Sequence, residues 1–235
     1  MTGKQILDKI GRKTIITGHY GSGKTEFAVS LAMLAGAFDD YDRCALIDLD
    51  IVNPYFRSRE RRELLENAGI AVYGSLYKNE VTAELPALDA NLRAPLESNS
   101  CRVIVDAGGN DTGALVLNQF TKYFMDEKTT VFAVVNANRP DTSDIDGALE
   151  HITGIEQITG LSVSGIVNNT HMLRETTADD IRLGHDFCKR ICNQTGKHLI
   201  CDCYPEGIID PDEFSGLSEN LMPLGLYLRP TWLDK

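Results

Sequence analysis

The sequence lacks the features that would place the chain in a membrane or in an oxidising compartment. No run of roughly 18 apolar residues occurs, so we expect no membrane-spanning helix. The N-terminus, MTGKQILDKIGRK, has basic residues but neither an apolar core nor a cleavage site of small residues, so we expect no secretory signal. The six cysteines then predict reduced thiols in a cytoplasmic protein.

Positive charge is also scarce. With 23 Lys and Arg against 34 Asp and Glu, the formal net charge is -11, which repels phosphate backbones and anionic lipid surfaces. We therefore expect neither nucleic acid nor a membrane as a partner. The dense basic run from Arg57 to Arg62 is interleaved with glutamates and indicates a solvated helix face. Residues 223–235 lack the basic amphipathic helix that is typical of membrane attachment.

Short apolar runs alternate with helix-like segments along the chain. This is the pattern of βαβ units, and it predicts one doubly wound α/β domain over residues 1–235 with a mostly parallel sheet of about seven strands. The expected strands are residues 14–17, 44–49, 71–73, 102–105, 130–135, 163–167 and 198–201. The expected helices are residues 24–35, 57–68, 112–125, 142–159 and 177–194, the last two capped by Asp141 or Thr142 and by Thr176 or Thr177. Residues 74–100 show no clear period and are expected to form a mobile insertion with one short helix.

The strongest motif is a phosphate-binding loop in the run TIITGHYGSGKT. Gly18, Gly23, Lys24 and Thr25 match G-x-x-x-x-G-K-[ST], after an expected strand and before an expected helix. Glycines let the backbone curl so that N–H groups point at phosphate oxygens, and the helix adds the positive end of its dipole. We expect Lys24 to reach the β- and γ-phosphates and Thr25 to hold Mg²⁺. The nucleotide-binding residues expected here are Gly18, His19, Tyr20, Gly21, Ser22, Gly23, Lys24, Thr25 and Glu26.

Acidic residues follow two of the expected strands. Asp48 and Asp50 are spaced to point the same way from an extended chain, and Asp106 ends an apolar strand that runs into glycines. A phosphate loop needs carboxylates for the metal and for the attacking water. This need predicts Asp106 at Mg²⁺ through water and the amide of Gly108 or Gly109 at the γ-phosphate, and it makes Asp48 and Asp50 the candidate acids of the other strand. An aspartate at a strand end can instead merely cap the next turn.

These three segments together resemble the MinD/ParA group of P-loop ATPases, within the CobQ/CobB/MinD/ParA class. The resemblance covers most of the chain, and the wording GHYGSGKTEF, LDIVNPYFRSRE and VNNTHML is similar to a bacterial subgroup of such proteins. It implies ATP and Mg²⁺ as cofactors, slow hydrolysis as a nucleotide-controlled switch, and a nucleotide-dependent homodimer. It also implies that Asp50 orients or activates the attacking water, with Asp48 as its neighbour near the metal.

The same resemblance implies how the base is bound. An asparagine after a later strand reads adenine in that group, which points to Asn168 or Asn169, because amides both donate and accept hydrogen bonds. Tyr204 and Pro205, after the last expected strand, resemble the segment that lies against the base. Both asparagines can instead be turn formers. The absence of an N-K-x-D sequence favours adenine over guanine.

One position departs from the MinD/ParA pattern. The deviant phosphate loop has a lysine directly after its first glycine, which reaches the nucleotide of the partner subunit, and this chain has His19 there. A neutral imidazole cannot supply the same fixed charge. Dimer-activated hydrolysis through this residue is therefore in doubt, and Arg57 or Arg139 is an alternative cation.

Other functions stay open at this point. An ATP-dependent small-molecule ligase or synthetase of the CobB or dethiobiotin synthetase type would need a substrate pocket or a glutaminase domain. A metallocentre-maturation NTPase would need a metal site, and only weak support comes from Cys188, Cys192, Cys201 and Cys203, since buried structural cysteines explain them better. The histidines show no metal spacing, which favours surface or loop roles for His151, His171, His185 and His198. The sequence does not identify the protein on which such a switch would act.

Overall fold

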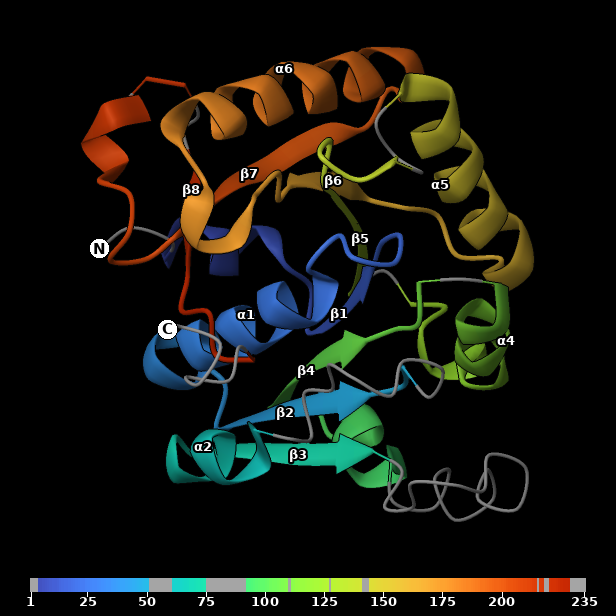
Figure 1. The fold of residues 1–235 in the computed structure, drawn as a ribbon. Coiled ribbons are helices and arrows are strands. Elements are labelled where there is room, and N and C mark those ends of the chain that lie inside the picture. The colour runs from blue at the N-terminus through green and yellow to red at the C-terminus, as the bar shows by residue number, and fades with distance from the viewer. Residues whose placement is uncertain are drawn as a thin grey trace.

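Eight parallel strands form a single sheet. A computed structural model describes residues 4–50, 61–74, 92–109, 111–126, 128–140, 144–214, 216–217 and 220–228. In these ranges the strand order is β3-β2-β4-β1-β5-β6-β7-β8, and every neighbouring pair is parallel (Figure 1). The strands are β1 (Lys13–Thr17), β2 (Arg43–Asp48), β3 (Ile70–Gly74), β4 (Cys101–Asp106), β5 (Thr129–Val135), β6 (Gly165–Asn168), β7 (His198–Pro205) and β8 (Leu221–Leu224).

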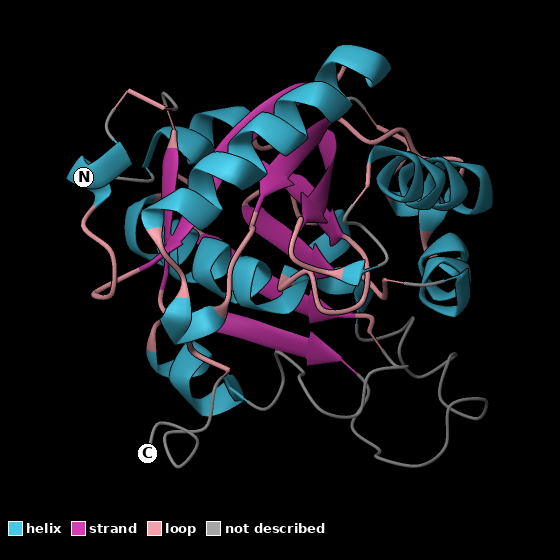
Figure 2. Cartoon of the chain, turned by 45° about the horizontal axis from the view of Figure 1, so that its top comes forward, coloured by secondary structure: helices cyan, strands magenta, loops and turns pink. Residues whose placement is uncertain are grey.

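Helices connect the strands and cover both faces of the sheet (Figure 2). The α-helices are α1 (Lys24–Phe38), α2 (Arg62–Asn67), α4 (Asp111–Gln119), α5 (Ile145–Thr159) and α6 (Ala178–Thr195), and residues 92–97 are also helical. Short 3₁₀ helices are η1 (Lys4–Lys9), η3 (Thr121–Tyr123), η5 (Leu173–Glu175) and η6 (Pro211–Phe214). Among the described helices, none combines the length and the apolar character that crossing a bilayer requires.

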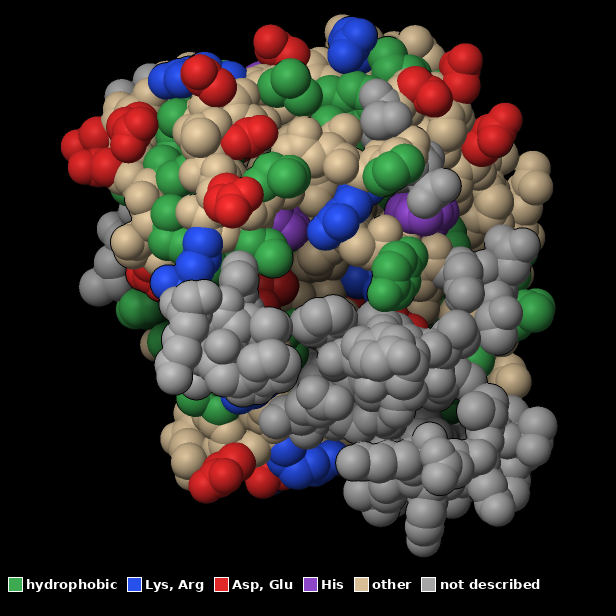
Figure 3. All heavy atoms as spheres, in the orientation of Figure 1, with side chains coloured by type: hydrophobic (Ala, Val, Ile, Leu, Met, Phe, Trp, Pro, Cys, Tyr) green, Lys and Arg blue, Asp and Glu red, His purple; other side chains and the backbone are tan. Residues whose placement is uncertain are grey.

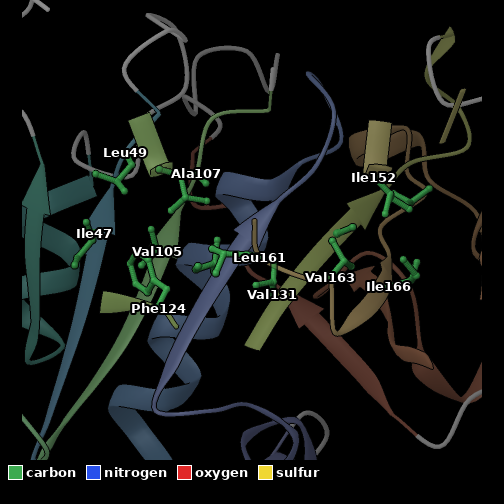
Figure 4. Packing of buried hydrophobic residues seen from close by; sticks show 14 of the residues in the cluster. Ile47, Leu49, Val105, Ala107, Phe124, Val131, Ile152, Leu161, Val163 and Ile166 are labelled. Atoms are coloured by element: carbon green, nitrogen blue, oxygen red, sulfur yellow. The ribbon is translucent and has the colours of Figure 1, made fainter. Parts of the chain in front are cut away.

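The core lies on both faces of the sheet because successive strand residues point in opposite directions. Ile15 packs into the cluster beneath α4, α5 and α6, whereas Ile16 packs into the cluster beneath α1 and α2. Figure 4 shows part of the first cluster, with Val105 and Val131 from the sheet and Ile152 from α5. The expected doubly wound α/β fold is therefore confirmed, with eight strands rather than about seven.

Several element boundaries differ from the expected ones. β8 was not expected, because its four residues include Pro223, which weakens a strand pattern. The helix expected over residues 112–125 ends at Gln119 and is followed by a 3₁₀ turn. Most of the expected mobile insertion lies outside the described residues, although residues 92–97 supply the short helix expected there.

The N-cap predictions had mixed outcomes. Thr177 caps α6 in a capping box with Asp180, as expected. Asp144 caps α5 by accepting a hydrogen bond from the Gly147 amide, and the expected caps Asp141 and Thr142 lie outside the described residues. Several acidic and hydroxyl residues precede α5 within four positions, so composition could not select among them.

The order in which the chain adds strands reverses at β1, and this point of the sheet is where a ligand site is expected. The chain builds β2, β3 and β4 on one side of β1 and β5 to β8 on the other. Ligands of open α/β sheets bind outside the carboxyl ends of the strands at such a point. β1 leads there directly into the glycine-rich loop before α1.

Candidate functional site

The glycine-rich loop between β1 and α1 has backbone angles that favour glycine. Gly21 has φ 79° and Gly23 has φ 80°, both in the left-handed region, and Gly18 has φ 154°. The Ser22 amide donates to the His19 carbonyl at 3.0 Å and closes a turn inside the loop. α1 then begins at Lys24 with no side-chain cap, so the amides of its first turn remain available to an anion.

Neighbouring strands press closely on this loop. A Cβ on Gly18 would lie 2.4 Å from the Val134 carbonyl oxygen, and a Cβ on Gly23 would lie 2.3 Å from Nδ2 of Asn169. Both distances are too short for any side chain larger than hydrogen. The loop is therefore seated directly against the ends of β5 and β6, and its shape is fixed by packing as well as by its own backbone.

Three side chains from the loops after β5 and β6 support the phosphate loop from outside. Arg139 donates from Nε to the Gly21 carbonyl at 2.8 Å, and Asn169 donates from Nδ2 to the Ser22 carbonyl at 2.7 Å. His171 lies against Gly23. Burial, together with the positive charge of Arg139, lowers the pKa of His171 to about 4, so its ring is neutral at pH 7. Arg139, one of the two alternative cations, thus stands beside the loop, whereas Arg57 lies outside the described residues.

The predicted acids converge on Lys24. Asp48 and Asp106 occupy paired positions on the adjacent strands β2 and β4. The Lys24 ammonium forms a buried ion pair with Asp50, with Nζ 2.8 Å from Oδ2, and the Asp50 amide donates to Asp48 Oδ1 at 3.1 Å. Lys24, Asp48, Asp50 and Asp106 are all buried. The structure therefore brings the lysine of the phosphate loop and the acids of two strands into one cluster.

Burial and like charges make this cluster electrostatically unusual. Burial alone lowers the pKa of Lys24, but the carboxylates of Asp106, Asp50 and Asp48 outweigh it, and the pKa is raised. Complete burial raises the pKa of Asp106 well above its usual range. Lys24 opposes that shift, while Asp48 and Asp50 add to it. One buried ammonium faces three carboxylates, so the cluster as it stands favours an additional positive charge.

Unpaired oxygens next to the loop fit a bound Mg²⁺. The Thr25 hydroxyl lies near Asp106 and favours its charged form, yet neither Asp106 carboxylate oxygen has a full hydrogen bond within the described residues. The buried hydroxyls of Thr17 and Ser22 also lack a partner there. No three His, Cys, Asp or Glu side chains of the described chain are arranged to hold a metal by themselves. The donor set therefore suits a hard cation that also takes ligands from a phosphate and from water.

A cavity of about 390 Å³ extends from the phosphate loop towards the ends of β7 and β8. Its lining residues are Tyr20, Gly21, Gly23, Lys24, Thr25, Glu26, Arg139, Asn169, His171, Leu173, Cys203, Tyr204, Pro205, Leu224, Leu226 and Leu228. Figure 3 shows Lys or Arg and His side chains near the middle of one face, with acidic and further basic side chains spread over the rest of it. Although the net charge of the chain is -11, the lining of this cavity includes two cationic side chains, Lys24 and Arg139, beside the single acid Glu26.

Asn168, one of the two asparagines expected to read the base, lies away from the cavity. It is completely buried and does not line the cavity. Its Nδ2 donates to the Ile181 carbonyl at 3.0 Å and to Asp202 Oδ1 at 2.6 Å, and its Oδ1 accepts from the Thr170 amide. Its Nδ2 therefore binds α6 and β7, and its Oδ1 binds the loop after β6. Asn169 reaches the cavity, but its Nδ2 is already bound to the phosphate loop.

The C-terminal part of the cavity wall could not be foreseen from the sequence. Leu224, Leu226 and Leu228 line the cavity after the unexpected strand β8. Glu26, in the first turn of α1, accepts hydrogen bonds from the Tyr227 and Leu228 amides and fastens this segment over the phosphate loop. No local pattern in residues 220–228 points to this contact, because it depends on where β8 ends.

The cysteines form no metal site in the described chain. All six are free and buried. Complete burial raises the pKa of Cys188 and of Cys203 well above the usual range, so their thiols stay protonated and unreactive at neutral pH. The four-thiolate arrangement does not occur among the described residues. Their burial supports the interpretation that these cysteines are structural residues of the core.

Comparisons with known proteins identify the fold of the chain, through solved structures alone. No family model matches the chain, and no curated protein sequence matches it. The signal recognition particle receptor FtsY from Elizabethkingia anophelis is similar at 15% identity and TM-score 0.50, with 83% of this chain and 62% of that chain covered. Chloroplast FtsY from Physcomitrella patens has 15% identity and TM-score 0.53, with 80% and 56% covered.

The chain has the P-loop NTPase fold. It spans less than two thirds of the length of these two FtsY proteins. A likeness at 15% identity supports the shared architecture of the P-loop NTPase domain, and it supports no statement about family or substrate.

The resemblance to the MinD/ParA group was wrong as a family assignment. The two solved structures described above are FtsY proteins and not members of the MinD/ParA group. The error has a physical reason. A phosphate loop with acids at two adjacent strand ends is required by nucleotide chemistry in P-loop proteins generally, so these motifs identify the fold and not the subgroup.

Proposed function

We propose that this protein is a nucleotide-controlled switch that binds ATP with Mg²⁺ and hydrolyses it slowly, within a single domain over residues 1–235. The observation that carries the proposal is the position of Lys24. Its ammonium lies at the start of α1, beside a loop shaped by Gly18, Gly21 and Gly23, and at one end of a cavity large enough for a nucleotide. This arrangement places one positive charge and the amides of a helix N-terminus where a phosphate chain would bind.

The ion pair between Lys24 and Asp50 gives the proposed switch a mechanism. When phosphate oxygens bind, Lys24 would exchange Asp50 for the nucleotide, because a doubly charged terminal phosphate is the stronger partner. Asp50, which follows β2, would then accept a proton from the water as the water oxygen bonds to the terminal phosphorus and ADP leaves. Binding is thereby coupled to the activation of the general base.

The metal fits the same cluster. Thr25 would bind Mg²⁺ through its hydroxyl, and Asp106 would hold it through water, with Asp48 as the paired acid on the adjacent strand. Bound there, Mg²⁺ would neutralise charge on the β- and γ-phosphates. A cation at this position would also offset the repulsion among the three buried carboxylates.

The cavity composition favours adenine. Guanine presents two adjacent donors, which a carboxylate matches best, whereas adenine presents one donor and one acceptor. Within the part of the chain that the structure describes, Glu26 is the only acidic residue of the lining, and its oxygens accept the Tyr227 and Leu228 amides. Tyr204 and Pro205 offer apolar surface for a purine ring. The GTPase alternative rests on fold likeness alone.

The proposed switch acts on a protein client that its chemistry does not name. Arg139 provides a cation beside the phosphate loop from within the same chain. A partner subunit is therefore not needed to replace the charge that His19 lacks. A nucleotide-dependent homodimer stays part of the proposal as a state that ATP can favour.

The test of this function titrates the protein with ATP and GTP in the presence and absence of Mg²⁺ and follows phosphate release. We expect Mg²⁺-dependent binding of ATP in preference to GTP, and slow hydrolysis. Asp50→Asn should bind ATP at least as well as the parent, because Lys24 loses its competing partner, while hydrolysis falls by about 100-fold or more. A parent that binds neither nucleotide would contradict the proposal, and parental hydrolysis by Asp50→Asn would remove Asp50 from it.

A further inference from the structure

His151 joins the phosphate loop to the loop that follows β4. It lies on α5, far from both loops in sequence. Its Nε2 lies 2.9 Å from the Gly109 carbonyl oxygen, and because a carbonyl only accepts, the ring donates this hydrogen bond. Its ring also meets the ring of His19 edge to face, with centroids 5.3 Å apart at 68°. One side chain of α5 thus contacts both segments that flank the Lys24 cluster.

Gly109 needs an external constraint of this kind. A Cβ at Gly109 would lie 2.1 Å from the Gly18 carbonyl oxygen, so the two loops touch through their backbones. Gly108 is packed as closely, since its Cβ would lie 2.5 Å from the Cα of Gly113. Two successive glycines have wide backbone freedom. Packing limits where they lie, and the hydrogen bond from His151 fixes the direction of the Gly109 carbonyl.

We propose that His151 is a positioning residue that makes nucleotide affinity depend on the terminal phosphate and passes that state to α5. The inference rests on the proposed function. A triphosphate is long enough to contact both the phosphate loop and the Gly109 loop, whereas a diphosphate contacts chiefly the first. A group that fixes the two loops relative to each other therefore contributes to triphosphate binding and little to diphosphate binding.

His19 gains a role in the same arrangement. It occupies the position after the first glycine of the loop, and its ring contact is with His151 of the same chain. The contact extends the coupling from Gly109 to the phosphate loop itself. The sequence pattern favoured a surface or loop role for His151, because nothing local in α5 shows which residue faces the Gly109 loop.

The experiment measures dissociation constants for AMPPNP and ADP with Mg²⁺ in the full chain. His151→Phe keeps a ring against His19 and removes the donor, whereas His151→Gln keeps a donor and removes the ring. We expect His151→Phe to lower the preference for AMPPNP over ADP by about 3- to 10-fold. ADP binding should stay within about twofold of the parent. His151→Gln should recover most of the preference, and His198→Gln, an exposed control at the start of β7, should behave as the parent.

Three outcomes would overturn this inference. One is a parental AMPPNP-to-ADP ratio in His151→Phe. Another is an equal loss of affinity for both nucleotides in the Phe and Gln variants, which would show a packing role. The third is a parent that binds no nucleotide, which contradicts the proposed function as well.

A parent that binds GMPPNP but no adenine nucleotide would contradict only the proposed preference for ATP. The same comparison is then made with GMPPNP and GDP.

A measurement on the parent alone covers the case in which a variant does not fold. In ¹⁵N-labelled histidine spectra, the Nε2–H signal of His151 should be that of a hydrogen-bonded donor and should shift between the ADP and AMPPNP states. The signal of His198 should stay constant. Identical His151 signals in the two states would contradict the coupling.

Discussion

The buried charges around Lys24 are the residue-scale feature on which the account depends. Asp106 is completely buried, and its pKa is raised by burial and by Asp48 and Asp50. A native state with a raised carboxyl pKa binds a proton more tightly than the unfolded chain. The stability that Asp106 contributes is therefore greatest at acid pH and falls as pH rises through its folded pKa. At neutral pH the protein without nucleotide carries this cost.

Asp106→Asn should stabilise the nucleotide-free protein at pH 7 and above. We expect a gain of about 1–2 kcal/mol, which corresponds to roughly 2–8 °C in Tm. The gain should shrink as pH falls towards 3.8, the ordinary pKa of an aspartate. Thermal unfolding of parent and variant across pH 4–8 (about the range where such groups titrate) measures the effect.

Asp126 supplies a control of opposite sign. Burial tends to raise the pKa of Asp126, but hydrogen bonds from Lys13 and Thr129 lower it overall. Asp126→Asn should therefore lose stability at neutral pH, and the loss should disappear in acid. A destabilised Asp106→Asn protein at pH 8 would show that the Asp106 carboxylate is not strained by its surroundings.

At the residue scale, the sequence indicated which side chains lie together where phosphate chemistry dictates the residue. Glycines, Lys24 and the acids at strand ends follow from what a phosphate needs, and the structure gathers them. The sequence did not distinguish Asn168 from Asn169. These neighbours have the same chemistry, and only the end of β6 at Asn168 decides that one side chain points to α6 and the other to the phosphate loop.

At the scale of elements, the contact of α6 with the loop after β6 is unusually close. A Cβ on Gly184 would lie 2.2 Å from Thr170 Oγ1 and 2.3 Å from Asn168 Oδ1. Both atoms belong to buried side chains that already make hydrogen bonds. They cannot move aside without breaking those bonds. Gly184 is therefore required inside α6 by close packing, and not by a turn of the backbone.

Gly184→Ala should destabilise the protein by about 1–3 kcal/mol, as overpacking of a filled core does. Gly154→Ala is the matched control, because Gly154 also lies inside a helix, α5, and a Cβ there meets nothing within 4 Å. That change should stabilise by roughly 0.5–1 kcal/mol through helix propensity. Urea unfolding measures both. Equal effects of the two alanines would contradict the close packing of α6 on Thr170.

Elements were predictable where a pattern is long and regular. The apolar strands of the sheet centre carry their own local signal and were predicted. The N-cap of α6 was narrowed to Thr176 or Thr177, and the structure has Thr177. β8 has only four residues and a proline, and it exists because β7 offers a free edge. The cavity wall at Leu224–228 depends on β8, so that part of the site was beyond local reasoning.

At the scale of the whole molecule, the fold followed from the alternation of strands and helices, but the family did not. Parallel strands buried on both faces have few topologies open to them, and the phosphate loop after β1 selects among these. The features that separate P-loop subgroups lie in surfaces and partners. Similarity to FtsY at 15% identity confirms the architecture and leaves the subgroup to experiment.

Charge also acts at this scale. The chain has a net charge of -11, yet its cavity contains Lys24 and Arg139. An anionic ligand would therefore be repelled by most of the surface and would meet two cationic side chains in the cavity. This distribution suits a small phosphate ligand that can enter the cavity better than a polyanion that must lie along the surface.

The central claim is that Lys24 and the loop before it bind the phosphates of a nucleotide. It is tested most directly by calorimetric titration of Mg²⁺ and ATP into the parent, Lys24→Ala and the control Lys189→Ala, whose lysine is exposed on α6. Loss of one buried charge-assisted contact weakens binding by at least about 10-fold. The account predicts that loss for Lys24→Ala, and parental binding for Lys189→Ala. Equal ATP affinity in Lys24→Ala and the parent would contradict it.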